Sequence, residues 1–95
     1  MRLGANEVTI IVEEIRRADA AAQIYLYGSR ADDTAKGGDI DLLVVSDQLG
    51  FQDTLELRIQ ILDRIGWQQL DLLVVRPDQL EQPMVVLARQ TGIKL

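Results

Sequence analysis

Two nearly identical apolar segments, DLLVVSDQL at 41–49 and DLLVVRPDQL at 71–80, begin thirty residues apart in this chain. A continuous run of Leu and Val is typical of a strand buried on both faces of a sheet. A helix is predicted between the two segments, and strands joined through a helix are usually parallel with a right-handed crossover. The aspartates that open the segments, Asp41 and Asp71, are therefore expected at one edge of a sheet. The similarity is explained equally well by a duplication and by the small set of apolar residue types that two buried strands of one sheet both use.

Hydrophobic periodicity predicts an α+β fold in which helices cover a small mixed sheet of about three strands, in the order α-β-β-α-β-α. Apolar residues at three- and four-residue spacing predict helices over 6–22, 53–65 and 84–92. Apolar, aromatic and β-branched runs predict strands over 23–27, 39–46 and 69–75. The stretch 28–38 is polar and rich in glycine, so it is a predicted loop, which allows strand 23–27 to run antiparallel to strand 39–46.

The predicted helix over 53–65 carries signals at both of its ends. Asp53 is expected to be its N-cap, and Gly66 is expected to follow its last turn. Leu55, Ile59 and Leu62 recur at helical spacing and are expected to face the core.

Size and composition limit the kinds of function that are possible. The 95 residues, 47% of them apolar, suit one domain over 1–95 with one core. The chain has no cysteine and no histidine, so any chemistry must use carboxylates, hydroxyls, Lys, Arg or a bound ion. The net charge of −5 opposes direct nucleic-acid binding. No apolar run approaches the roughly 20 residues of a membrane span and the first residues lack a signal-peptide pattern, so a cytoplasmic protein without membrane contact is expected.

Three aspartates are predicted to share one rim of the sheet. Asp39 and Asp41 project to the same face because side chains alternate along a strand, and Asp71 would join them from the parallel strand. Like charges about 5 Å apart repel by roughly 3 kcal/mol at an effective dielectric near 20, so such a cluster favours a raised pKa or a bound cation. An all-oxygen site suits Mg²⁺ or Mn²⁺ rather than zinc.

Two alternatives to a metal site follow from the same residues. The acids could share a proton as a catalytic pair, or they could simply form an exposed strand tip. The dipeptide Gly28-Ser29 argues against the shared proton, because glycine lets the backbone approach a ligand and Ser29 adds a hydroxyl donor for phosphate oxygens.

An apolar strand ending in Gly28-Ser29, a nine-residue loop, a buried strand opening Asp39-Ile40-Asp41 and a third acid at Asp71 form a combined pattern. This pattern resembles the nucleotidyltransferase superfamily that includes DNA polymerase β, kanamycin nucleotidyltransferase and the minimal nucleotidyltransferases of prokaryotes. The resemblance covers most of the chain. It implies that residues 1–95 form a single nucleotidyltransferase domain.

The resemblance also implies a role for each residue of the pattern. Gly28 and Ser29, together with Arg30, would bind the triphosphate of a nucleotide. Asp39 and Asp41 would bind one or two Mg²⁺ or Mn²⁺ ions, and Asp71 would complete the catalytic metal site beside the acceptor hydroxyl, as ligand or base.

The chain departs from the family pattern directly after the Gly-Ser. Many relatives carry Ala-Arg-Gly soon after it, whereas this chain has Ala31-Asp32-Asp33, and two extra acids would repel a triphosphate. Arg30 and Lys36 could offset these charges or be ordinary loop residues. Three aromatic residues, Trp67, Tyr25 and Tyr27, are expected to pack rather than to stack on a base, and no residues form a recognisable adenine pocket.

Small size, in the light of the resemblance, points to a protein substrate. Minimal relatives are commonly found beside a helical HEPN partner, in some cases as the antitoxin that adenylylates a tyrosine of that partner. The resemblance therefore implies a Mg²⁺-dependent protein adenylyltransferase that uses ATP, acts as the antitoxin of a toxin-antitoxin pair and assembles as a homo- or hetero-oligomer. The alternative is a non-catalytic antitoxin, a binding module that inhibits its helical partner by occlusion.

Overall fold

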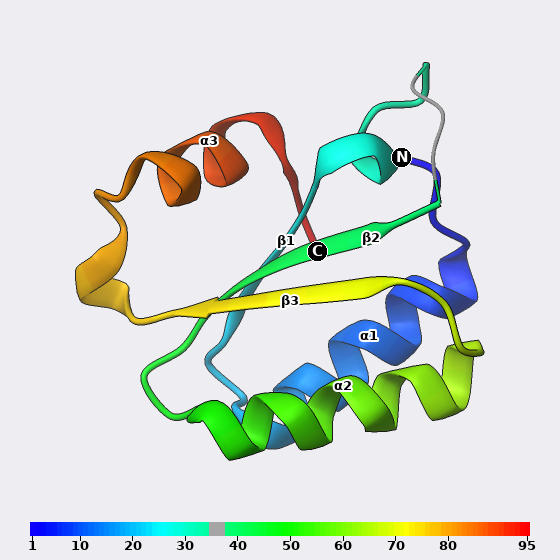
Figure 1. The fold of residues 1–95 in the computed structure, drawn as a ribbon, viewed down its shortest axis with the longest axis horizontal. Helices are drawn as coiled ribbons and strands as arrows, with labels where there is room; N and C mark the ends of the chain where they lie inside the picture. Colours follow the sequence, from blue (N-terminus) through cyan, green and yellow to red (C-terminus); the bar gives the residue numbers. More distant parts are fainter. Residues whose placement is uncertain (35–37) are drawn as a thin grey trace.

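The computed structural model describes residues 1–34 and 38–95, which form a four-stranded sheet in the order β3-β2-β1-β4 (Figure 1). Helices α1 and α2 lie on one face of the sheet and α3 lies on the other, as expected for the predicted α+β class. No helix in the described ranges is both long and apolar enough to cross a membrane. The elements are α1 (Ala5–Ala18), β1 (Gln23–Tyr27), the 3₁₀ helix η1 (Gly28–Ala31), β2 (Ile40–Val45), α2 (Phe51–Ile65), β3 (Leu70–Val75), the 3₁₀ helix η2 (Pro77–Gln79), α3 (Pro83–Thr91) and β4 (Ile93–Lys94).

The two DLLVV segments lie side by side in the centre of the sheet. They pair as the parallel strands β2 and β3, with matching positions of the two segments opposite each other from Asp41 and Asp71 to Val45 and Val75. Strand β1 runs antiparallel to β2 and places Tyr27 opposite Asp41. The predicted mixed arrangement of these three strands is confirmed, and it brings the end of β1 to the beginnings of β2 and β3.

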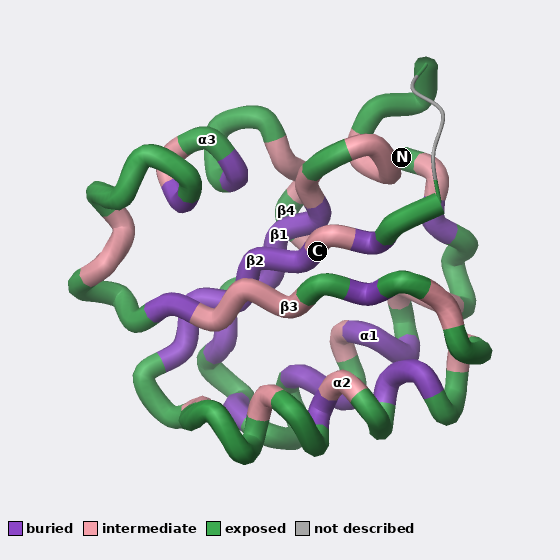
Figure 2. The backbone as a smooth tube through the Cα atoms, viewed as in Figure 1, coloured by how far each residue is buried: buried purple, intermediate pink, exposed green. Residues whose placement is uncertain are grey.

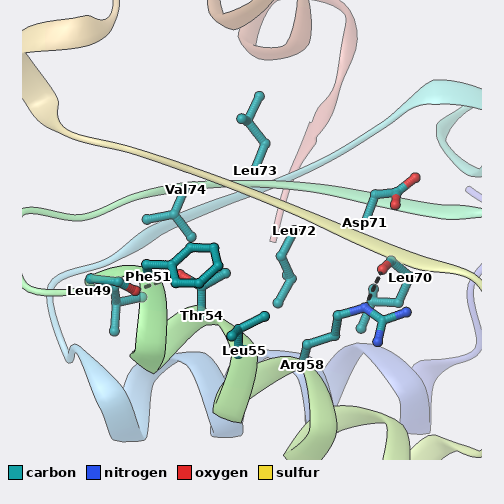
Figure 3. A pocket seen from close by; sticks show the side chains of 11 residues that line it. Leu49, Phe51, Thr54, Leu55, Arg58, Leu70, Asp71, Leu72, Leu73 and Val74 are labelled. Atoms are coloured by element: carbon teal, nitrogen blue, oxygen red, sulfur yellow. Dashed lines mark hydrogen bonds between the residues drawn. The ribbon is translucent and has the colours of Figure 1, made fainter.

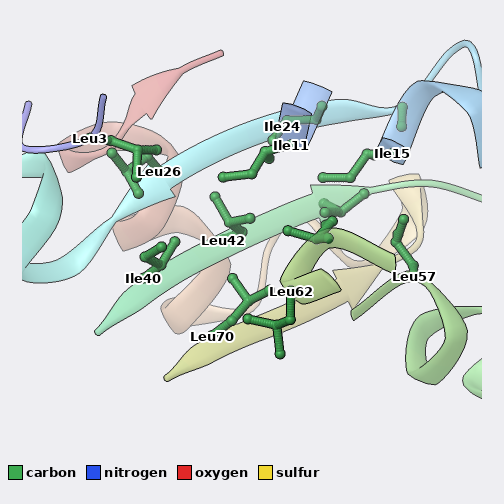
Figure 4. Close-up of a cluster of buried hydrophobic side chains, with 13 residues drawn as sticks. Leu3, Ile11, Ile15, Ile24, Leu26, Ile40, Leu42, Leu57, Leu62 and Leu70 are labelled. Atoms are coloured by element: carbon green, nitrogen blue, oxygen red, sulfur yellow. The ribbon is translucent and has the colours of Figure 1, made fainter. Parts of the chain in front are cut away.

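Strand β2 is buried on both faces, as its continuous apolar sequence predicted (Figure 2). On one face, Leu42 belongs to the larger core that α1 and α2 cover, which is drawn in Figure 4. On the other face, Leu43 packs in a smaller cluster with Val85 and Ala88 of α3. That cluster ends before Asp41, which is half-buried, and Asp71 is exposed. Helix α3 therefore leaves the beginnings of β2 and β3 open to solvent.

Two helix boundaries differ clearly from the prediction. Helix α1 ends at Ala18 rather than at residue 22, because the Asp19 carboxylate accepts hydrogen bonds from the Ala21 amide at 3.0 Å and from the buried Ser46 hydroxyl at 2.6 Å. Helix α2 begins at Phe51, and Asp53 lies in its first turn, where it accepts a hydrogen bond from the Gly50 amide at 2.9 Å. Asp53 is therefore not the N-cap.

The C-terminal residues add a strand that was not predicted. β4 has two residues and pairs antiparallel with β1, so Leu26 lies opposite Ile93. The Leu95 amide extends this contact by donating to the Ile24 carbonyl at 2.9 Å. A two-residue strand has no periodicity that a sequence reading could detect.

The face that α2 turns to the core also differs from the prediction. Leu57, Ile61 and Leu62 are buried, whereas Leu55 and Ile59 are 44% and 49% exposed. Trp67, which was expected to pack, is 68% exposed. Helix α2 is thus apolar on its inner face and on part of its outer face.

Candidate functional site

The centre of the candidate site is a pair of carboxyl groups at the beginnings of β2 and β3. Asp41 and Asp71 are directly opposite each other in the parallel register, so their side chains project from the same face of the sheet. Burial raises the pKa of Asp41, and a side-chain hydrogen bond with Asp71 and the negative charges of Asp71 and Asp39 raise it further. Two acids in this relation favour a shared proton or a bound cation.

Asp39 is the third acid that was predicted for this site. It immediately precedes β2 and is exposed, and its charge contributes to the raised pKa of Asp41. Within residues 1–34 and 38–95, no three acidic side chains are grouped so that they could hold a metal ion by themselves. The structure thus brings together two of the three predicted metal ligands, and the role of Asp39 stays a prediction.

Gly28 brings the main chain against the acid pair. Its φ is +74°, a conformation that favours glycine, and a Cβ atom built on it would lie 2.4 Å from Asp41 Oδ2. A side chain at this position would therefore displace the carboxyl group. Ser29, half-buried in η1, follows directly, and its carbonyl accepts a hydrogen bond from Arg2 Nη2 at 2.9 Å. The end of β1 thus lies at the start of β2, as predicted, and Gly28 lies against Asp41.

Arg30 has structural contacts that the sequence did not reveal. Its guanidinium group donates to the carbonyls of Arg2 and Gly38, both at 2.9 Å. Gly38 precedes Asp39, so Arg30 ties η1 to the entrance of β2. Its predicted contact with a nucleotide stays a prediction, and Lys36, considered with it, lies outside the described residues.

Tyr27 is a neighbour of the site that sequence reasoning assigned only to packing. It is half-buried opposite Asp41 in the antiparallel register. Burial and the charges of Asp41 and Asp71 raise the pKa of its hydroxyl group. A sequence signal could have placed Tyr27 beside the acids. Side chains alternate along β1, and once β1 pairs with β2 its last residue lies opposite the first residues of β2 and on the same face.

A groove of about 480 Å³ runs between α2 and the outer strand β3 and touches the site at Asp71 (Figure 3). Leu70, Leu72 and Val74 point into the groove, whereas Asp71 and Leu73 point to the opposite face of the sheet. Arg58 crosses the groove and donates to the Leu70 carbonyl at 3.0 Å. The groove is lined mainly by apolar side chains and reaches the acid pair at Asp71, whose carboxyl group points to the opposite face of the sheet.

The acid pair has the donor chemistry of a magnesium site. Mg²⁺ is usually held by one or two carboxylates together with phosphate oxygens and water, rather than by a complete cage of protein ligands. Asp41 and Asp71 supply two carboxyl groups. Burial, a hydrogen bond with Asp71 and the charges of Asp71 and Asp39 raise the pKa of Asp41, and a cation would offset the part that comes from these charges. These residues fit the divalent ion that the sequence predicted.

Comparison with known protein families gives a match over most of the chain. The family model of the nucleotidyltransferase domain matches residues 8–91, from the first turns of α1 to the end of α3. A search among curated proteins found no match to this chain.

Proposed function

Because this chain belongs to the nucleotidyltransferase domain family, we propose that it transfers AMP from ATP to a tyrosine hydroxyl of a helical HEPN-type partner, as the cytoplasmic antitoxin of a toxin-antitoxin pair. Nucleotidyl transfer is the chemistry of the family. The observation that supports a working site most strongly is the pairing of Asp41 with Asp71 directly beside Gly28.

Each residue of the site has a role in this proposal. The main chain at Gly28 and Ser29 binds phosphate oxygens, while Asp41 and Asp71 hold Mg²⁺ or Mn²⁺ with Asp39 as a further ligand. The bound ion supplies charge stabilisation to the attacking and leaving oxygens of an in-line displacement. The tyrosine oxygen forms a bond to the α-phosphorus, the bond from that phosphorus to the β-phosphate oxygen breaks, and pyrophosphate leaves. Asp71, the more exposed acid, accepts the tyrosine proton.

A protein partner is supported by the outer face of α2. Phe51, Leu55 and Ile59, which we call the outer stripe, recur at four-residue spacing and are 81%, 44% and 49% exposed. Exposed apolar residues along one helix face are a common way of binding another helix. The same stripe would serve a homo-oligomer or a hetero-oligomer.

A second candidate function is inhibition of the partner by occlusion, without catalysis. One observation favours it: Asp32 and Asp33 are exposed acids close to the position proposed for the triphosphate. In this case the acid pair would be a remnant or a regulatory site.

Labelled transfer tests the first candidate. The chain and its helical partner are co-expressed, and transfer of AMP from ATP labelled at the α-phosphorus is measured for the wild type and for Asp41→Asn, Asp71→Asn and Asp39→Asn. Asp63→Asn, an exposed acid on α2, is the matched control. We expect Asp41→Asn and Asp71→Asn to lose at least a hundredfold in rate and Asp63→Asn to keep its rate. Transfer that survives Asp41→Asn would refute the assigned site.

The occlusion candidate makes the opposite prediction for the same variants. If binding alone inhibits the partner, Asp41→Asn still silences it and Phe51→Ser does not. If transfer is required, Asp41→Asn binds the partner but leaves it active. Measuring partner activity beside transfer separates the two functions.

A further inference from the structure

A hollow of about 820 Å³ lies between η1 and α3, next to the acid pair. It begins at Tyr27 and Gly28, the residues that contact or neighbour Asp41. Its volume is within the range of roughly 300–1,000 Å³ that is usual for small-molecule sites. The lining residues are Tyr27, Gly28, Ala31, Asp32, Asp33, Met84, Leu87, Ala88 and Thr91.

The two walls of the hollow differ in chemistry. The α3 wall carries Met84 and Leu87, two large apolar side chains that are 49% and 56% exposed although they line a concave surface. The η1 wall ends in Asp32 and Asp33, whose carboxylates only accept hydrogen bonds. Asp32 Oδ1 accepts from the Thr34 amide at 2.9 Å, and Asp33 pairs with the terminal amine of Met1. A ligand in the hollow therefore needs a flat apolar body and a donor-bearing edge.

The same acids decide which part of a nucleotide suits this place. The negative charges of Asp32 and Asp33 make this end of the hollow less favourable for a triphosphate, although both acids are exposed and the terminal amine of Met1 offsets part of the charge of Asp33. The phosphates belong instead at Gly28 and the acid pair, where a cation can compensate their charge. The rest of the nucleotide then extends across Tyr27 towards α3.

Resting on the proposed function, we propose that the hollow between η1 and α3 binds the nucleoside end of the nucleotide, with the base against Met84 and Leu87. The carboxylates at its rim accept hydrogen bonds from an amino group of the base or from ribose hydroxyls. The ligand class is a purine ribonucleoside that bears an exocyclic amine. The acids that replace the usual residues after the Gly-Ser thereby become part of base and sugar recognition.

Methionine NMR gives a direct test that needs neither metal nor transfer. The chain contains two methionines, and Met84 lines the hollow while Met1 does not. In protein labelled with ¹³C-methyl methionine, titration with adenosine is expected to shift the Met84 methyl signal through the ring current of the base. The Met1 methyl signal is expected to shift less. Purine riboside, which lacks the 6-amino group, is expected to bind about tenfold more weakly, because a hydrogen bond to a carboxylate is lost.

Variants test the same hollow with the complete nucleotide. Leu87→Trp, which fills the hollow, is expected to weaken binding of a non-hydrolysable ATP analogue with Mg²⁺ at least tenfold, measured by calorimetry. If the larger side chain unfolds α3, Leu87→Ser serves as the second variant. It removes apolar surface from the hollow and is expected to weaken binding severalfold. Trp67→Ser, at an exposed apolar side chain that does not line the hollow, is the matched control and should bind as the wild type does.

The outcomes separate this inference from the proposed function. An unmoved Met84 signal at saturating nucleotide, or wild-type affinity in folded Leu87→Trp, would overturn the inference even if transfer is observed. A shifted Met84 signal together with weakened binding in Leu87→Trp would support the nucleoside site even if no acceptor is modified. In that case only the proposed AMP transfer would be refuted.

Discussion

Replacing Asp41 by Asn should stabilise the folded protein at neutral pH while abolishing transfer. Burial, the hydrogen bond with Asp71 and the charges of Asp71 and Asp39 raise the pKa of Asp41 in the folded state. A carboxyl group whose folded pKa lies above its unfolded value favours folding while it is protonated, and this stability is lost as the pH rises through the folded pKa. Asn is neutral at every pH and can keep a hydrogen bond to Asp71, so it should not lose that stability.

The size of the effect follows from the sheet geometry. Neighbouring strands lie about 4.8 Å apart, and two unit charges at about 5 Å repel by roughly 3 kcal/mol at an effective dielectric near 20. Asp71 is exposed, and pairs in water contribute only about 0.2–1 kcal/mol, so the upper value must be reduced for screening. We expect Asp41→Asn to raise the free energy of unfolding by about 1 kcal/mol at neutral pH, or Tm by roughly 4–8 °C for a domain of this size.

Urea unfolding of both proteins in EDTA measures this difference. It should be present at pH 7.5 and should disappear below the unfolded pKa of aspartate, about 3.9, where both proteins carry a neutral group at this position. Asp63→Asn should show no comparable gain at either pH. A loss of stability in Asp41→Asn, or a gain that is equal at both pH values, would refute the assignment of repulsion between the two acids.

Other substitutions test separate parts of the account. Gly28→Ala should lower the stability more than Gly66→Ala: alanine at a positive φ costs roughly 1–2 kcal/mol at either position, but only at Gly28 would the new Cβ atom also meet the Asp41 carboxyl group. Thermal unfolding compares the two variants, and equal losses of stability would contradict the close approach of Gly28 to Asp41. Ser46→Ala should lower the free energy of unfolding by roughly 1–3 kcal/mol, because the buried Asp19 carboxylate loses its hydroxyl donor. An unchanged free energy in urea unfolding would contradict the hydrogen bond between Ser46 and Asp19. Trp67→Ser should change stability by less than about 0.5 kcal/mol, and a larger loss by the same measurement would mean that the indole packs.

The paired strands and the acid pair could be predicted because local signals determine them. The two DLLVV segments indicate buried strands, and the helix between them indicates a parallel pairing, which places Asp41 beside Asp71. The glycine before Ser29 was also identifiable, although its φ and its distance from the Asp41 carboxyl were not. These features depend on residues that lie within one βαβ unit or at its edge.

The remaining features depend on contacts between distant residues. Helix α1 ends early because Asp19 bonds to Ser46, which lies 27 positions further along the chain. The buried face of α2 could not be chosen from periodicity, because the helix is apolar both on the side of Leu57 and on the side of Leu55. The guanidinium group of Arg30 donates to the carbonyls of Arg2 and Gly38. No local sequence pattern indicates these partners, so the sequence predicted only a nucleotide contact for Arg30.

Anomalous scattering from Mn²⁺ tests the central claim most directly. Crystals of the chain with a non-hydrolysable ATP analogue and Mn²⁺ should give an anomalous peak at about 2.0–2.3 Å from carboxylate oxygens of both Asp41 and Asp71, with the triphosphate beside Gly28. A bound nucleotide whose metal ion contacts neither of these two acids would contradict the account.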